Sequence, residues 1–320
     1  MPDAEPGEAE VSDGARETKH RNARAEFEAT VADIEAQVRA TNDKINARSG
    51  RNLSMALVVG IALGVALILS LIFVKAVFVL FATVMIGFTA FELASALRFA
   101  GRDVPRIPVL ISAIVIVPLS FYFLSAGHWL ATLSGIVLVA VWRIAEQLVP
   151  SKRASLRNVV KDMTAGAFVL AYVVFLASFT AVLTAQDGGQ WWTLAFLLVV
   201  ISTDTGAYAS GLTWGKHPMA PTISPKKTWE GFFGSVVAAT TTGVLLAIFM
   251  LDQPWWVGII LGVTIALTAT AGDLSESLIK RDLGIKDIST WLPGHGGFLD
   301  RLDSILPSAV AAFGLYLLFV

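Results

Sequence analysis

Long apolar runs alternate with short polar connections along the chain, after an initial polar stretch of about fifty residues. A helix that crosses a bilayer needs roughly 20 consecutive, mostly apolar residues. Nine stretches meet this requirement, at about 53–74, 76–97, 107–126, 129–149, 163–185, 191–212, 232–250, 254–272 and 304–320. The pattern therefore predicts an all-α fold, a polytopic membrane bundle of about nine transmembrane helices.

The distribution of lysine and arginine predicts the orientation of this bundle. Cytoplasmic connections of membrane proteins are enriched in these two residues. With a cytoplasmic N-terminus, the basic segments 98–106, 143–161, 216–227 and 280–301 all lie inside, and Lys75 is the single basic residue outside. We therefore expect a multi-pass protein of the cell (inner) membrane, with its N-terminus in the cytoplasm and its C-terminus outside.

The composition agrees with a membrane protein. Of the 320 residues, 55% are hydrophobic and only 15% are charged, and the mean hydropathy is +0.68. Soluble domains carry about 25% charged residues. The chain has no cysteine, which excludes disulfides and thiolate metal sites. The first apolar run follows a long polar leader, which argues against a cleaved signal peptide.

Residues 1–50 are predicted to form a cytoplasmic arm ahead of a transmembrane domain at 51–320. The arm holds 7 basic and 11 acidic residues, and the composition of its tip, residues 1–18, is typical of disorder. Between residues 19 and 48 an apolar series recurs at helical spacing, with Thr41 in the same series: Phe27, Val31, Ile34, Val38 and Ile45. Two interpretations stay open. The series is either a short heptad seam through which two copies of the chain associate as a homodimer, or the apolar face of a solvated amphipathic helix near the membrane.

Three polar segments gather on the predicted inner side, and the first is S-T-D-T-G-A-Y at 202–208. Asp204 lies about two turns before the predicted membrane exit, where an acid is expected to face a polar cavity. A structural hydrogen bond to a neighbouring helix is the alternative. A transporter would place Asp204 and Asp162 on an ion path, but transporter sites lie near the bilayer midplane. Here the polar residues cluster at one face.

The second segment is S-P-K-K-T-W-E-G at 224–231. Lys226, Lys227 and Thr228 stand beside an expected helix start, where lysines and unpaired backbone N–H groups can neutralise phosphates. The charge rule for inner connections also accounts for the two lysines. It does not account for the surrounding residues, so we expect a phosphate-binding loop.

The third segment contains two charged helical faces. Asp273, Ser277 and Lys280 have the spacing i, i+4, i+7, which places them on one face of a helix that continues the eighth span. Gly284 is expected to end this helix.

Asp300, Asp303 and Ser304 have the spacing i, i+3, i+4 at the start of the ninth span. The turn at 293–297 returns the chain toward the membrane, so the two acidic faces are predicted to meet. Carboxylates from two helices make an oxygen-rich site suited to Mg²⁺. His295 within the turn binds phosphate or the backbone, and the two interpretations stay open.

These segments resemble the signature of the phosphatidate cytidylyltransferases (CDP-diacylglycerol synthases). The resemblance lies in S-L-I-K-R at 277–281, K-D at 286–287, P-G-H-G-G at 293–297 and D-R-L-D at 300–303. S-P-K-K-T-W-E-G at 224–231 and Asp204, Ala207 and Tyr208 are similar to upstream motifs of that family. The resemblance covers about residues 53–320 and is strongest from residue 200 onward.

The resemblance implies an enzyme that transfers CMP from CTP to phosphatidic acid, forming CDP-diacylglycerol and pyrophosphate in phospholipid biosynthesis. By position, the resemblance implies that Asp273 and Asp300 bind a metal ion and that Ser277 and Lys280 beside them are essential residues. Because the nucleophile is already an anionic phosphate, catalysis requires charge neutralisation more than a general base. The expected catalytic residues are Asp273, Ser277, Lys280 and Asp300; the expected metal ligands are Asp273, Asp300 and Asp303; the expected substrate-binding residues are Lys226, Lys227, Thr228, Arg301, His295 and Asp204.

The expected partners are CTP, phosphatidic acid and membrane lipids, and no nucleic acid. The expected cofactor is Mg²⁺, and a second cation beside it stays open. Because CTP is cytosolic and the lipid lies in the membrane, the active site is expected on the cytoplasmic side. A CTP-dependent kinase or a cytidylyltransferase acting on a polyprenol or ether-lipid phosphate is the alternative enzyme, and a transporter is the alternative of another class.

Overall fold

The structure is a computed structural model, and it describes residues 53–320 apart from 286–287, 290 and 292–295. The predicted arm with its apolar series at 27–45 lies outside the described residues, and so do Lys286, Asp287 and His295. Residues 59–320 form one compact unit, which is the unit described below.

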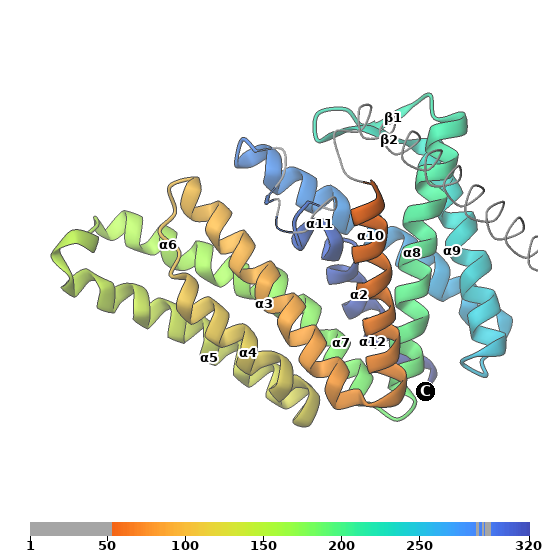
Figure 1. Cartoon of the computed structure of the whole chain (residues 1–320), viewed down its shortest axis with the longest axis horizontal. Coiled ribbons are helices and arrows are strands. Elements are labelled where there is room, and N and C mark those ends of the chain that lie inside the picture. The colour runs from red at the N-terminus through yellow and green to blue at the C-terminus, as the bar shows by residue number, and fades with distance from the viewer. Residues whose placement is uncertain (1–52, 286–287, 290, 292–295) are drawn as a thin grey trace, which may run out of the picture. The chain divides into compact units, whose positions relative to one another are not determined.

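The described chain is almost entirely helical (Figure 1). Helices suit a bilayer because each one satisfies its own backbone hydrogen bonds. The helices are α2 (Leu53–Phe73), α3 (Lys75–Phe99), α4 (Arg106–Tyr122), α5 (Leu124–Ala145), α6 (Leu156–Val169), α7 (Leu176–Ala185), α8 (Gly189–Trp214), α9 (Trp229–Phe249), α10 (Trp255–Asp282), α11 (Leu299–Leu302) and α12 (Ile305–Phe319). Two short 3₁₀ turns, η1 (Glu146–Leu148) and η2 (Pro150–Lys152), follow α5, and a π-helical turn, η3 (Leu170–Phe175), joins α6 to α7.

The predicted all-α polytopic bundle is confirmed. Within the described residues, seven helical stretches are long and apolar enough to cross a membrane: Lys75–Phe99, Leu124–Leu148, Leu156–Ala185, Gly189–Trp214, Trp229–Phe249, Trp255–Asp282 and Leu299–Phe319. The other two predicted spans are shorter apolar helices, Gly60–Phe73 within α2 and Arg106–Tyr122. The count of nine crossings and the cytoplasmic N-terminus stay predictions.

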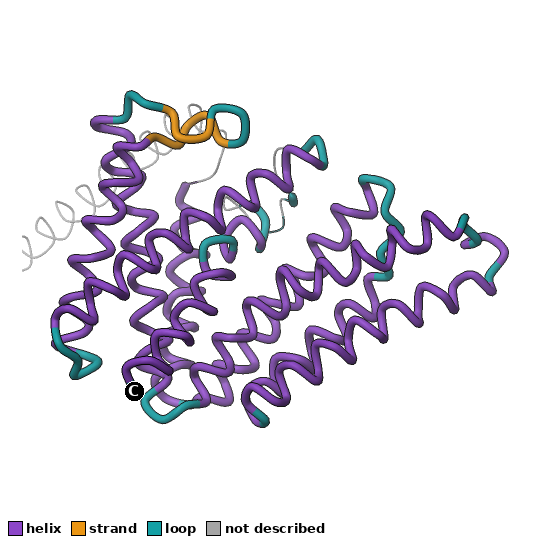
Figure 2. The backbone as a smooth tube through the Cα atoms, turned by 180° about the vertical axis from the view of Figure 1, so that it is seen from behind, coloured by secondary structure: helices purple, strands orange, loops and turns teal. Residues whose placement is uncertain are grey.

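Some boundaries differ from the apolar runs. The helix predicted at 254–272 continues as α10 to Asp282, and Gly284 follows with a φ of +69°, so the predicted helical extension and its glycine stop are confirmed. The loop predicted between α8 and α9 contains an antiparallel hairpin, β1 (Pro218–Ala220) and β2 (Ser224–Thr228). Figure 2 shows this hairpin at the end of the bundle where α8 and α9 meet.

Two apolar clusters hold the helices that carry the polar motifs. One joins α3, α4 and α7 through buried side chains such as Leu93, Val109 and Ala177. The other joins α8, α10 and α12 through Phe196 and Leu261, among others. Because α12 packs against α7 and α10, the start of α12, next to Asp303, is held against both clusters.

Candidate active site

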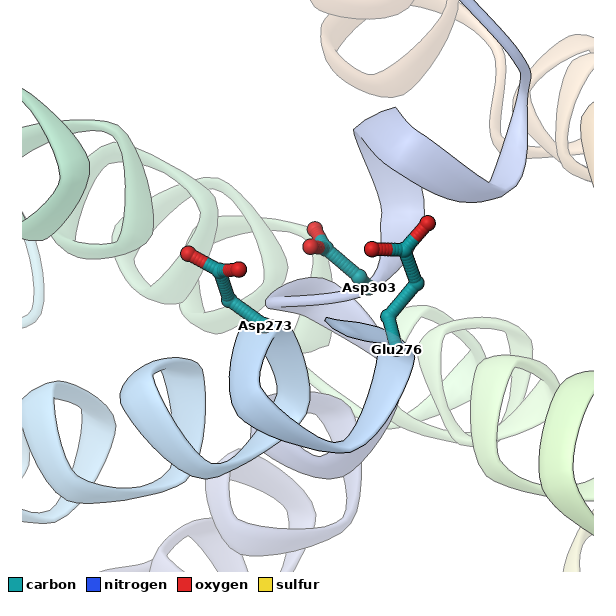
Figure 3. A group of neighbouring side chains, drawn as sticks. All are labelled: Asp273, Glu276 and Asp303. Atoms are coloured by element: carbon teal, nitrogen blue, oxygen red, sulfur yellow. The ribbon is translucent and has the colours of Figure 1, made fainter. Parts of the chain in front are cut away.

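Three carboxylates meet where α10 passes the start of α12. Asp273 and Glu276 lie one turn apart on α10, and Asp303 lies between α11 and α12 (Figure 3). One oxygen of each carboxylate lies within 4.8 Å of the others. Glu276 and Asp303 are buried, with exposed fractions of 1% and 9%. The prediction that the two acidic faces meet is therefore confirmed for Asp273 and Asp303.

A glycine permits this close approach. A Cβ atom at Gly272 would lie 2.2 Å from the carbonyl oxygen of Asp303, which is closer than real side chains come. The absence of a side chain at Gly272 thus lets the backbone that carries Asp303 lie directly on α10, beside Asp273.

Lys280 connects this cluster to Asp300. Its Nζ atom lies 2.5 Å from Glu276 Oε2 and 2.9 Å from Asp300 Oδ1. The other oxygen of Asp300 accepts the backbone N–H of Gly297 at 2.8 Å. Both carboxylate oxygens of Asp300 are therefore bound, one by a lysine and one by a backbone amide. The third carboxylate beside Asp273 and Asp303 is that of Glu276. A metal-binding role for Asp300 stays a prediction.

The hairpin supplies one of its two lysines to the cluster. Lys227 Nζ lies 2.6 Å from Asp273 Oδ2, whereas the neighbouring Lys226 is exposed. The Thr228 hydroxyl accepts the backbone N–H of Gly231 at 3.1 Å and so caps α9. Of the three residues predicted to bind phosphate here, the structure brings Lys227 to the acidic cluster and gives Thr228 a capping contact.

Glu230 and Arg281 fix the hairpin over the site. Both carboxylate oxygens of Glu230 bind the chain at His217: Oε2 accepts its backbone N–H at 3.2 Å, and Oε1 lies 2.5 Å from Nδ1. Arg281 on α10 donates from Nε to the carbonyl of Ile223 at 3.2 Å. These contacts hold β2, and with it Lys227, against the end of α10.

Asp204, Ser277 and Ser304 lie around the same cluster. Ser304 Oγ lies 3.5 Å from Asp204 Oδ1, and Ser277 Oγ lies 3.5 Å from Asp273 Oδ1. Asp204 also interacts electrostatically with Asp273, Lys227 and Arg301. Asp204 therefore faces a charged group contributed by α8, α10, the hairpin and the α11–α12 segment.

Glu92 is a residue that the sequence pattern missed. It lies in the last third of α3 with an exposed fraction of 2%, and its Oε2 accepts the backbone N–H of Leu299 at 2.8 Å. Its other oxygen accepts the hydroxyl of Ser289. A Cβ atom at Gly297 would lie 2.4 Å from Glu92 Oε1, so a side chain there would displace the Glu92 carboxylate. Glu92 thus anchors the segment that leads into Asp300 and Asp303.

An aromatic group supports the same anchor. Phe88 of α3 stacks on Phe298 with ring centroids 5.0 Å apart, and Phe91 lies 5.8 Å from Trp291. Trp291 and Phe298 therefore pack on the same part of α3 that carries Glu92.

Tyr172 is a second missed residue, and it lies in the π-helical turn η3. Its hydroxyl is buried and has no hydrogen-bond partner among the described residues. It interacts electrostatically with Asp303, Glu276 and Asp273. Single π-helical turns are frequent at functional sites. Tyr172 therefore presents an unpaired donor to the acidic cluster.

The charges of the site suit a divalent cation. Five carboxylates (Asp204, Asp273, Glu276, Asp300 and Asp303) share the site with three cations (Lys227, Lys280 and Arg301), a formal sum of −2 over these side chains. Glu276 Oε1 is buried with no hydrogen-bond partner among the described residues. Buried carboxylates in such a group require a partner, and oxygen ligands are what Mg²⁺ prefers. The residues present therefore fit a magnesium ion.

Asp162 lies apart from this site, in an ion-pair network. Its Oδ2 lies 2.8 Å from Arg143 Nη2 and 3.0 Å from Arg143 Nε, and its Oδ1 accepts the backbone N–H of Asp103 at 2.9 Å. Arg143 and Asp162 are both buried. These contacts give Asp162 a structural role in joining α5 to α6, and they remove the basis for placing it on an ion path.

Comparison with known proteins agrees with this site. The model of the cytidylyltransferase family matches residues 54–319. The chain is similar to a phosphatidate cytidylyltransferase of Mycobacterium bovis, 43% identical over 272 residues, which is 83% of this chain and 89% of the relative. It is also 38% identical to one of Mycobacterium leprae over 274 residues (83% and 88%), and 33% identical to one of Staphylococcus epidermidis over 204 residues (62% and 75%).

The chain belongs to the cytidylyltransferase family. The family match covers all the helices that build the site, from α3 to α12, and the predicted membership is confirmed.

Proposed function

We propose that this membrane protein transfers CMP from CTP to phosphatidic acid and releases pyrophosphate, the reaction that forms CDP-diacylglycerol in phospholipid biosynthesis. The relatives named phosphatidate cytidylyltransferase support this function, at 43% identity over most of both chains. The observation that carries it is the group of Asp273, Glu276 and Asp303 with two lysines beside it, at the end of a membrane-spanning helix. Such a group fits a reaction between two phosphate-bearing substrates, one of which is a lipid.

The cation-binding residues follow from the geometry. Asp273, Glu276 and Asp303 would hold Mg²⁺, which supplies charge neutralisation of phosphate oxygens and of the leaving pyrophosphate. Asp300 binds Lys280 and thereby orients the ammonium group toward Glu276. We assign to Asp300 this positioning of Lys280.

The cationic side chains neutralise the substrates. Lys227 of the hairpin and Lys280 of α10 each pair with a carboxylate of the acidic cluster. In the substrate complex their ammonium groups bind phosphate oxygens, and Arg301 joins them from α11. This assignment requires no general base, because the attacking phosphate of phosphatidic acid is an anion at neutral pH.

Tyr172 and Ser277 complete the site as hydrogen-bond donors. The Tyr172 hydroxyl has no partner in the described protein, so a substrate oxygen or a bound water would accept its proton. Ser277 lies 3.5 Å from Asp273 and donates either to this carboxylate or to a phosphate oxygen. The site faces the cytoplasm, the compartment that contains CTP.

The test is a pyrophosphate-release assay with purified protein, Mg²⁺, CTP and phosphatidic acid. The expected result is turnover that requires all four components. Polyprenol phosphate and an ether-lipid phosphate, offered as acceptors in parallel, should give much lower rates than phosphatidic acid. Equal or faster turnover with another lipid phosphate, or with ATP in place of CTP, would contradict the proposed substrates.

A further inference from the structure

Two adjoining cavities lie at the α3–α4 and α5–α6 connections, apart from the acidic cluster. The first, of about 250 Å³, is lined mainly by polar side chains, including Arg102, Arg143 and Arg153. The second, of about 420 Å³, is lined mainly by apolar side chains such as Ile107 and Trp142, together with basic residues. Lys152 lines both cavities, so the polar cavity and the apolar cavity are neighbours with this residue between them.

The acids of this region are already paired with other cations. Asp103 lies 2.8 Å from Arg98, and Asp162 lies 2.8 Å from Arg143. Glu146 binds Lys152 and lies 3.7 Å from Arg143. Each of the three carboxylates that line the two cavities is therefore already paired with an arginine or a lysine of the protein.

Two arginines of the polar cavity have no such partner. Among the described residues, the side chain of Arg102 makes no hydrogen bond or ion pair, and Arg153 donates only to the carbonyl of Gln147, at 3.3 Å. Over both cavities the linings hold six cations (Arg98, Arg102, Arg106, Arg143, Lys152 and Arg153) and three carboxylates (Asp103, Glu146 and Asp162), a formal sum of +3. A compact anion bound in the polar cavity would balance this excess of positive charge.

The surroundings of the cavities specify what carries this anion. Phe99, Leu148 and Leu156 flank the connections with exposed fractions of 80% or more, as expected for side chains in contact with lipid. Basic pockets between transmembrane helices bind the headgroups of anionic lipids. A free phosphate would leave the adjoining apolar cavity unused, whereas a phospholipid fills both parts.

We propose that the paired cavities at Lys152 bind one anionic phospholipid of the bilayer, with its phosphate at Arg102 and Arg153 and an acyl chain along Ile107, Trp142 and Val149. This site is separate from the acidic cluster. On α3, Arg98 at the rim lies six residues beyond Glu92, which is about 9 Å along the helix axis. The lipid therefore lies at the same end of the bundle as the candidate active site, and the proposal does not depend on which reaction that site performs.

The test measures lipid binding to the full-length protein in detergent by native mass spectrometry. The probe is phosphatidylglycerol, which is anionic and is not the proposed substrate, and phosphatidylcholine and inorganic phosphate are the comparison ligands. The double variant Arg102→Ala/Arg153→Ala should bind phosphatidylglycerol about 30-fold more weakly. Each of the two arginines attracts the anionic headgroup, and the loss of both attractions together corresponds to a change in Kd of this size. Arg157→Ala is the matched control, because Arg157 is exposed on α6 and lines neither cavity.

The expected pattern is tight binding of phosphatidylglycerol to the wild type and to Arg157→Ala, and weak binding to the double variant. The Tm of the double variant should equal that of the wild type, which shows that it is folded, and its rate of CMP transfer should also be unchanged. Unchanged binding by the double variant, or equally tight binding of phosphatidylcholine, would overturn the proposal. Full displacement of the lipid by inorganic phosphate would identify a free anion as the ligand and would overturn it as well.

Discussion

Glu92 accepts the backbone N–H of Leu299 with 2.8 Å between Oε2 and the amide nitrogen, across 207 residues of sequence. The contact places a buried carboxylate of α3 at the N-terminus of the short helix α11. Asp300 is the next residue after Leu299 and Asp303 lies three residues further on, so the position of both acids depends on this anchor. Glu92 is therefore a positioning residue, which acts through the segment that it binds.

Replacing Glu92 by Gln should lower CMP transfer about 10- to 100-fold. Gln keeps the size but loses the charge, and a buried hydrogen bond to a charged group contributes about 1.5–3 kcal/mol. The Mg²⁺ concentration for half-maximal turnover should rise in the same variant, because Asp303 loses its fixed position. Steady-state kinetics over a Mg²⁺ series measures both effects.

Ser95→Ala is the control for Glu92→Gln. Ser95 lies on the same helix, and among the described residues its hydroxyl binds the carbonyl of Phe91 and, at 3.5 Å, Arg106. Its kinetics should match those of the wild type. A Glu92→Gln protein with an unchanged Mg²⁺ requirement would show that Glu92 does not position the acidic cluster.

Glu276→Gln and Asp300→Asn should have different effects on metal dependence. Glu276 belongs to the carboxylate cluster, so its loss should raise the Mg²⁺ requirement at least about tenfold. Asp300 binds Lys280, so its loss should lower kcat strongly with a smaller change in the Mg²⁺ requirement. Equal Mg²⁺ curves for Glu276→Gln and the wild type would exclude Glu276 as a ligand.

Asp162→Asn should lower the thermal stability of the detergent-solubilised protein. The change leaves the buried guanidinium of Arg143 without its closest carboxylate, and breaking a buried pair in this way costs about 3–5 kcal/mol. Asp252→Asn, at an exposed position, is the control and should leave the Tm unchanged. An unchanged Tm for Asp162→Asn would show that the ion pair does not stabilise the junction of α5 and α6.

Deleting residues 1–48 should leave CMP transfer measurable. The family match begins at residue 54, and every residue of the acidic cluster lies beyond residue 200. The assay compares the initial rates of the truncated and the full-length protein under the same conditions. Complete loss of activity in a truncated protein with a normal Tm would show that the arm is part of the catalytic machinery.

The bundle could be predicted from the sequence because each span carries its own signal, a run of apolar residues. The approach of Asp273 to Asp303 was also predictable, since helical spacing puts each on a defined face and a turn joins the two helices. Glu276 was accessible by the same rule. It lies three residues after Asp273 and four before Lys280, so it shares their face of α10.

Other features leave no local pattern in the sequence. Glu92 is a single acid within an apolar span, and its partner Leu299 is distant in the chain. Tyr172 reaches the cluster because η3 is π-helical, and the wider turn shifts the face on which a residue points. The hairpin sequence S-P-K-K-T contains a proline and lacks strand alternation, so nothing in it predicts β2.

The most direct test of the cation site is a crystal structure with Mn²⁺ and CTP, with the metal located by its anomalous scattering. A metal ion bound to the carboxylates of Asp273, Glu276 and Asp303 and in contact with the phosphates of CTP is the predicted result. A metal ion bound elsewhere, with these three carboxylates in contact with protein groups alone, would contradict the account.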